Sequence, residues 1–218
     1  MSVQPLAVLF TGIPGAGKTT LCTRLHATEG FPVLTASAAL AAYAQAAPER
    51  VSRWREEYWT VGKNAPDEEV NPVLWEAFIR TAGGSPLPVL LDGYPRTTGQ
   101  ARDFLDRGGV LKTVVLLEVA PMTALRRIGI RSASSGRTDD HVEIAVQRIK
   151  REQRAIDALL QLTELRHVLL RLDCERSPVE DACAQILNAL AGCDKPRAAT
   201  PPCVPSADAH VPGRPTPR

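Results

Sequence analysis

Four continuous apolar runs constrain the fold of this chain more than any other feature. They occupy residues 6–10, 88–92, 113–119 and 167–173, with a weaker fifth run at 31–35. Apolarity that is continuous rather than alternating is typical of strands covered on both faces, as in a parallel sheet. Helix-compatible segments lie between the runs, at 17–28, 97–107, 121–131, 140–163 and 177–191. This alternation predicts an α/β fold with a doubly wound, parallel, five-stranded sheet.

The alternation is interrupted between residues 37 and 82. Two stretches there, 37–59 and 67–82, read as helices with no strand between them. We therefore expect a core formed by residues 1–36 and 83–192, with a helical insertion at 37–82. Residues 193–218 contain seven prolines, a density that excludes helix and central strand and predicts a disordered tail. A Pro-rich docking segment is the alternative reading of this tail.

Composition and charge exclude several functional classes. The chain has 26 basic and 24 acidic residues, and a net charge of +2 is too small to indicate nucleic acid or an anionic membrane as the main partner. No apolar segment approaches the roughly 20 residues of a membrane span, and the first residues do not resemble a signal peptide. The five cysteines form no C-x-x-C pair and no zinc spacing, which favours reduced thiols in a cytoplasmic protein.

A glycine-rich segment, GIPGAGKTT at residues 12–20, directly follows the first apolar run. We call it the phosphate loop, because it fits the pattern G-x-x-x-x-G-K-[ST] between a strand and a helix. Its glycines let backbone N–H groups point into one concavity at a helix N-terminus, where phosphates bind. Lys18 is predicted to reach the β- and γ-phosphates of ATP, and Thr19 to ligate Mg²⁺. The predicted ATP-binding residues are Gly12, Pro14, Gly15, Ala16, Gly17, Lys18, Thr19 and Thr20.

The second run ends in LLDGYPR, residues 90–96. A carboxylate at the carboxyl end of a buried strand beside the phosphate loop can hold Mg²⁺, so Asp92 is the second predicted metal ligand. Arg96 follows a rigid turn and can grip a phosphate with its two-pronged guanidinium group. The alternative is an ordinary Asp-Gly turn followed by an exposed arginine.

These two motifs together resemble those of the adenylate kinase family of nucleoside monophosphate kinases. The family pattern D-G-[FY]-P-R-x-x-x-[QN] is complete in DGYPRTTGQ, and GIPGAGK matches G-x-P-G-x-G-K; the resemblance covers roughly residues 5–192. It implies a P-loop kinase fold in which residues 37–82 bind the acceptor. It also implies that Arg96 binds the acceptor phosphate and that Gln100 reads the acceptor base, typically adenine.

The same resemblance assigns roles to a cluster of arginines. SGRTDD, residues 135–140, is similar to a short lid, which we place at about 132–140. By position, Arg127 and Arg131 would contact ATP, Arg137 and Arg148 the acceptor, and Asp139 and Asp140 would orient these arginines. Together with Lys18 and Arg96, these four arginines are the predicted catalytic residues. The remaining arginines of the region, Arg126, Arg151 and Arg154, are expected on a solvated helix face.

The acceptor site departs from the family pattern in two places. Ala36 stands where the family has a threonine near the acceptor base, and Ala41 stands where it has an arginine that binds the acceptor phosphate. The predicted activity is Mg-ATP-dependent phosphoryl transfer to a nucleoside monophosphate, AMP in the first instance, by a monomer. Because the acceptor oxygen is already anionic, this reaction needs alignment and charge neutralisation rather than a general base. Two alternatives stay open: a kinase for another small acceptor, with Asp92 as base, and a nucleotide-binding regulatory protein without turnover.

Overall fold

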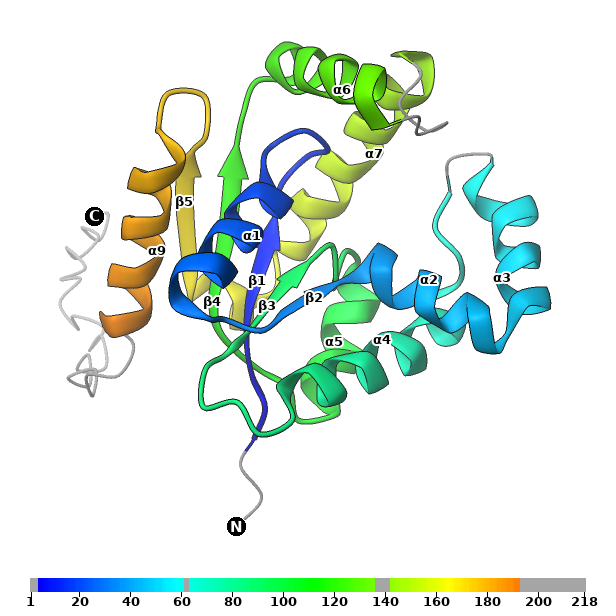
Figure 1. Ribbon diagram of the computed structural model, residues 1–218, viewed down its shortest axis with the longest axis horizontal. Coiled ribbons are helices and arrows are strands. Elements are labelled where there is room, and N and C mark those ends of the chain that lie inside the picture. Colours follow the sequence, from blue (N-terminus) through cyan, green and yellow to red (C-terminus); the bar gives the residue numbers. More distant parts are fainter. Residues whose placement is uncertain (1–3, 61–62, 136–141, 193–218) are drawn as a thin grey trace, which may run out of the picture.

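The fold is built around one parallel sheet. The computed structural model describes residues 4–60, 63–135 and 142–192. The strands are β1 (Leu6–Thr11), β2 (Val33–Thr35), β3 (Val89–Asp92), β4 (Val110–Glu118) and β5 (Leu169–Asp173). Their order is β2-β3-β1-β4-β5 and every neighbouring pair is parallel (Figure 1). The predicted fold class is confirmed, and each of the five apolar runs forms a strand.

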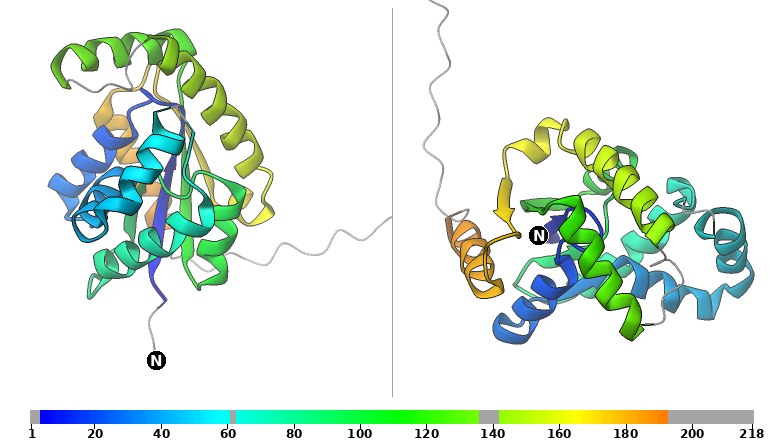
Figure 2. Two further views of the ribbon diagram at one scale, coloured as in Figure 1. Left: turned by 90° about the vertical axis from the view of Figure 1, so that its right-hand side faces the viewer. Right: turned by 90° about the horizontal axis from the view of Figure 1, so that it is seen from above.

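Helices cover both faces of the sheet. On one face lie α1 (Lys18–Glu29) and α9 (Val179–Gly192), which contact each other. On the other lie α5 (Thr98–Asp106) and α7 (Val142–Leu159), as the view from above in Figure 2 shows. Alternate strand residues feed the two cores: Val8 and Phe10 pack on the α1 side, and Ala7 and Leu9 on the α5 side, all at most 1% exposed. The strands are therefore buried on both faces, which explains their continuous apolarity.

The described part of the predicted insertion is mostly helical and contains no strand. It contains α2 (Ala36–Ala46), α3 (Pro48–Trp54), a short π-helix η1 (Arg55–Trp59) and α4 (Asp67–Ala82), which lie beyond the β2 edge of the sheet (Figure 1). The first predicted stretch is divided at Ala47, whose φ of −138° and ψ of 63° are not helical. The break has a simple cause, because a residue that precedes proline is pushed out of the helical region. The division into a core and an acceptor-binding insertion remains a prediction.

The last part of the sheet is connected through α6 (Pro121–Ser135), α7 and the short helix α8 (Thr163–Arg166). The helix expected over 140–163 is shorter: α7 ends at Leu159, and turn hydrogen bonds from Gln161 N to Ala158 O (3.1 Å) and from Leu162 N to Leu159 O (3.1 Å) lead into α8. The turn allows both Leu159 and Leu165 to be fully buried. Most of the predicted lid and the whole predicted tail, residues 136–141 and 193–218, lie outside the described residues. Among the helices that the structure describes, none combines the length and the apolarity needed to cross a membrane.

Candidate functional site

The phosphate loop connects the carboxyl end of β1 to the start of α1. Its glycines are required by geometry: Gly15 has a φ of 83°, and a Cβ atom there would lie 2.6 Å from the carbonyl oxygen of Ala124 on α6. Gly12 is equally restricted, since its Cβ would lie 2.7 Å from the carbonyl oxygen of Leu117. No side chain caps the N-terminus of α1. The first N–H groups of that helix therefore have no side-chain cap, which leaves them available to an anion.

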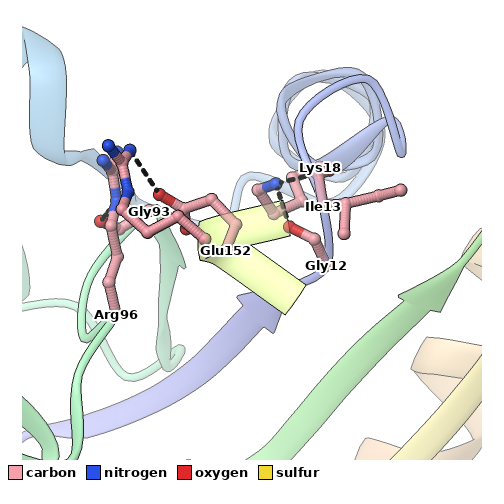
Figure 3. Close-up of polar contacts among 7 residues, drawn as sticks. Gly12, Ile13, Lys18, Gly93, Arg96 and Glu152 are labelled. Atoms are coloured by element: carbon pink, nitrogen blue, oxygen red, sulfur yellow. Dashed lines mark hydrogen bonds and ion pairs between the residues drawn. The ribbon is translucent and has the colours of Figure 1, made fainter. Parts of the chain in front are cut away.

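Lys18 is folded back over this loop. Its Nζ donates hydrogen bonds to the carbonyl oxygens of Gly12 (2.6 Å) and Ile13 (3.2 Å), as Figure 3 shows. Burial of the ammonium group is the main reason that its pKa falls to about 8. Four charged neighbours modify this pKa: the carboxylates of Asp92 and Glu152 raise it, and the guanidinium groups of Arg96 and Arg148 lower it. The predicted catalytic lysine thus lies in a cluster of charges contributed by β3, the following loop and α7.

The two predicted metal ligands lie in direct contact. Thr19 Oγ1 donates a 2.6 Å hydrogen bond to Asp92 Oδ2 across the end of the sheet. Asp92 is 5% exposed and pairs in register with Phe10, the second-last residue of β1. A hydroxyl and a carboxylate are hard oxygen donors, and Mg²⁺ typically takes only one or two such protein ligands beside phosphates and water. The donor set fits Mg²⁺, and no cluster of three His, Cys, Asp or Glu side chains suited to a metal occurs within residues 4–60, 63–135 and 142–192.

Arg96 and Gln100 form one hydrogen-bonded unit beside this site. Arg96 Nε donates to the carbonyl oxygen of Gly93 (2.7 Å), and its backbone N–H donates to Gln100 Oε1 (2.8 Å). Gln100 Nε2 donates in turn to Asp67 Oδ1 (2.8 Å), and Thr97 Oγ1 donates to Asp67 Oδ2 (2.5 Å). Gln100 is 4% exposed, so its amide is held rigidly at both ends. The network ties the predicted acceptor residues to the N-terminus of α4.

The predicted arginines of the lid region are described to different extents. Arg127 Nη2 donates to the carbonyl oxygen of Cys174 (2.8 Å), and Nη1 to that of Gly15 (3.5 Å), so α6 holds this side chain over the phosphate loop. Arg148 lies close enough to influence the pKa of Lys18. Of Arg131 only the backbone, within α6, is described. Arg137, Asp139 and Asp140 lie outside the described residues, so their roles remain predictions.

Three other arginines were expected on a solvated face. Arg126 and Arg154 are exposed, as expected, but Arg151 is not. Its side chain is only 35% exposed, its Nη2 lies 3.3 Å from Glu152 Oε1, and its Nε is buried without a hydrogen-bond partner among the described residues. Arg151 is therefore partly buried beside Glu152 and not fully on a solvated face.

Two arginines of the insertion that could stand in for one at position 41, Arg50 and Arg53, have partners within the insertion. Ala36 is 4% exposed and Ala41 lies on the surface of α2. Arg50 donates a 3.0 Å hydrogen bond to Tyr43 Oη, and Arg53 is ion-paired with Glu69. Both arginines line a separate cavity of about 560 Å³ between α3 and α4, together with Tyr43, Glu68, Glu69, Pro72, Val73 and Glu76. Neither is held in contact with Arg96.

Comparison with known proteins places this geometry in a family. The family described as AAA domain matches residues 11–145, from the end of β1 to α7. An adenylate kinase of Thermus thermophilus is 35% identical over 182 residues, which cover 80% of this chain and 91% of the relative. The chain belongs to the adenylate kinase family. It is an enzyme of the nucleoside monophosphate kinase class, and its resemblance to that family is confirmed.

Other relatives of this kinase share less of its sequence. Adenylate kinase isoenzyme 1 of Sus scrofa is 27% identical over 183 residues, 84% of this chain and 93% of the relative. A UMP-CMP kinase of Danio rerio is 27% identical over 193 residues, 86% of this chain and 98% of the relative. The relatives thus carry names with different acceptor bases.

Two residues of the kinase site were not anticipated from the sequence. Asp67 bonds both Gln100 and Thr97, and Glu152 lies near Lys18. Signals for both were present. Asp67 opens the predicted helix at 67–82, and Glu152 follows Arg148 by four residues, which places both on one helix face.

Proposed function

We propose that this kinase transfers the γ-phosphoryl group of ATP to AMP, forming two molecules of ADP. The observation that carries the proposal is a contact between the phosphate loop and the end of β3. The hydrogen bond from Thr19 to Asp92 joins the phosphate loop to the strand whose next turn bears Arg96. The proposed ATP site and Arg96, the proposed ligand of the acceptor phosphate, therefore lie at one edge of the sheet. This edge is where open α/β sheets bind ligands.

In the proposed mechanism, charge neutralisation and alignment do the catalytic work. The phosphate loop holds ATP through backbone N–H groups, and Lys18 moves from the carbonyl oxygens of Gly12 and Ile13 to the β- and γ-phosphates. Thr19 and Asp92 would hold Mg²⁺, which supplies further neutralisation at the phosphates when bound. The acceptor oxygen is already anionic, so no residue has to remove a proton.

The acceptor side rests on Arg96 and Gln100 in this proposal. Arg96 grips the phosphate of AMP, and its guanidinium group is aimed by the hydrogen bond of Nε to Gly93. Gln100 contacts adenine through the hydrogen-bonding positions of its amide that Arg96 and Asp67 do not use. Arg127 and Arg131 neutralise ATP, and Arg137 and Arg148, oriented by Asp139 and Asp140, close on the acceptor.

We also propose that the kinase acts as a monomer in the cytoplasm, without a nucleic-acid or membrane partner. The small net charge of +2 and the scattered cysteines support this. Light scattering after size exclusion, with and without ATP, tests the monomer: a mass near 23.6 kDa is expected.

The test of the acceptor is a coupled assay of ADP production with AMP, CMP, UMP or GMP, and with ATP alone. We expect AMP to be the best acceptor, with a high KM because Ala41 leaves Arg96 without a second arginine. A charge-assisted hydrogen bond to phosphate contributes roughly 1.5–3 kcal/mol, about 10- to 150-fold in affinity. Ala41→Arg should therefore lower the KM for AMP and leave the KM for ATP nearly unchanged. A clear preference for CMP or UMP would refute AMP as the acceptor and keep the class of enzyme.

A further inference from the structure

A carboxylate stands among the cations of the phosphate site. Glu152 lies on α7 with its side chain 14% exposed. Figure 3 shows it between Lys18, which belongs to the phosphate loop, and Arg96, which belongs to the turn after β3. Its Oε1 also lies 3.3 Å from Nη2 of Arg151. This acidic side chain thus lies among cations that are proposed to bind the phosphates of both substrates.

The charges around Lys18 make the position of Glu152 notable. The charged side chains near enough to the ammonium to shift the pKa of Lys18 are Asp92 from β3, Arg96 from the following turn, and Arg148 and Glu152 from α7. Asp92 has a partner in Thr19 and a proposed task at Mg²⁺. Glu152 has no task in the proposed mechanism, because an anionic acceptor needs no base. A carboxylate at this place instead repels the phosphates that the site is built to bind.

We propose that Glu152 is a positioning residue that acts as an internal counter-ion of the phosphate site. In the nucleotide-free kinase its carboxylate balances Lys18, Arg96 and Arg151, so that these cations stay together without a ligand. An incoming phosphate becomes the anion that balances these cations, and its negative charge repels the carboxylate of Glu152. Glu152 therefore stabilises the empty site and weakens nucleotide binding. The inference rests on the part of the proposed function that places ATP at Lys18.

The test is Glu152→Gln, which keeps the shape of the side chain and removes its charge. We expect the melting temperature of the nucleotide-free variant to fall, because the cations lose their counter-ion. Calorimetric titration with ATP should at the same time show tighter binding, on the order of tenfold, which corresponds to about 1.4 kcal/mol.

Two variants serve as controls. Glu152→Asp keeps the charge and should stay nearer to the wild type than to Glu152→Gln in both measurements. Glu180→Gln removes a carboxylate from α9 whose side chain is 68% exposed and 3.6 Å from Arg24, and it should change neither. If Glu152→Gln binds ATP as weakly as, or more weakly than, the wild type and keeps its turnover, Glu152 is only structural and the proposal is wrong. If it binds ATP unchanged and loses turnover, the carboxylate acts as a base, which also overturns the proposal.

These measurements stand apart from the proposed reaction. ATP binding and melting temperature are measurable even if no nucleoside monophosphate is phosphorylated. Failure of the acceptor assay with a positive result here would refute the proposed reaction alone.

Discussion

The buried charge of Lys18 is expected to lower the stability of the fold and to promote catalysis, and Lys18→Met separates these two effects. The ammonium group is partly buried against the phosphate loop, and its pKa falls from an ordinary 10.5 to about 8, mainly because of burial. The difference of about 2.5 pKa units corresponds to roughly 3 kcal/mol at 1.36 kcal/mol per unit. The charged form of Lys18 therefore destabilises the nucleotide-free fold by about that amount relative to the neutral form.

The sign of the pH dependence follows from this lowered pKa. Below about pH 8 both the folded and the unfolded chain carry the proton, and the penalty is constant. Between about 8 and 10.5 the unfolded chain binds more protons, so the contribution of Lys18 to the free energy of unfolding rises with pH. Lys18→Met has no such group. Its free energy of unfolding should exceed that of the wild type by about 1–3 kcal/mol at pH 7, and the advantage should shrink as the pH rises above 8.

The assay is urea unfolding of both proteins between pH 7 and pH 10 without nucleotide, with Lys63→Met as the control for an exposed lysine. Lys18→Met should also lower kcat at least 10²-fold, because Lys18 neutralises charge that grows in the transition state. A variant that is less stable than the wild type at pH 7, or a stability difference that does not change with pH, would refute the reasoning about burial. A kcat above about a tenth of the wild-type value would refute the proposed catalytic role.

Three further predictions concern other parts of the molecule. Gly15→Ala should lower the free energy of unfolding by more than about 2 kcal/mol and weaken ATP binding, because its Cβ would meet the carbonyl of Ala124 at 2.6 Å. Gly30→Ala is the control: Gly30 has a similar φ of 76° and open space around it, so the free energy of unfolding should fall by only about 1 kcal/mol. Glu69→Ala should lower it by about 1–3 kcal/mol in urea unfolding, because the N–H of buried Trp54 loses its 2.9 Å acceptor, and Glu69→Gln should recover most of that loss. Deletion of residues 193–218 should change neither melting temperature nor activity; a large loss of stability would show that this segment packs on the core.

The parts of the fold that could be predicted are those encoded by local pattern. Strands β1 and β3 were predicted to within a residue, because their side chains are buried on both faces and the sequence there is continuously apolar. β4 was predicted to start at residue 113 but starts at Val110, where Val110 and Leu111 pair with Leu6 and Ala7 ahead of an irregularity in the register. That pairing depends on a neighbouring strand, so the local pattern does not contain it.

In the site, too, local motifs were predictable and contacts that depend on the tertiary fold were not. The order of residues along two motifs was enough to predict Lys18, Thr19, Asp92 and Arg96 as neighbours at one edge of the sheet, and the structure places Thr19 and Asp92 in direct contact. Arg151 was beyond such reasoning, because a charged side chain on a long helix faces solvent unless a distant segment packs against it. For Glu152 the spacing from Arg148 indicates a shared helix face, but not that this face lies near Lys18. Here the phosphate loop and the turn after β3 approach that helix, and the contacts arise only from the tertiary fold.

The most direct test of the account is to follow the γ-phosphate itself. Wild-type kinase is incubated with Mg²⁺, ATP labelled at the γ-phosphate and one unlabelled nucleoside monophosphate at a time, and the products are separated. The account predicts that the label moves to AMP and appears in ADP, that little free phosphate forms with ATP alone, and that Arg96→Ala, which removes the proposed acceptor contact, abolishes the transfer. Label released only as inorganic phosphate, or none transferred to any nucleoside monophosphate at several millimolar, would contradict it.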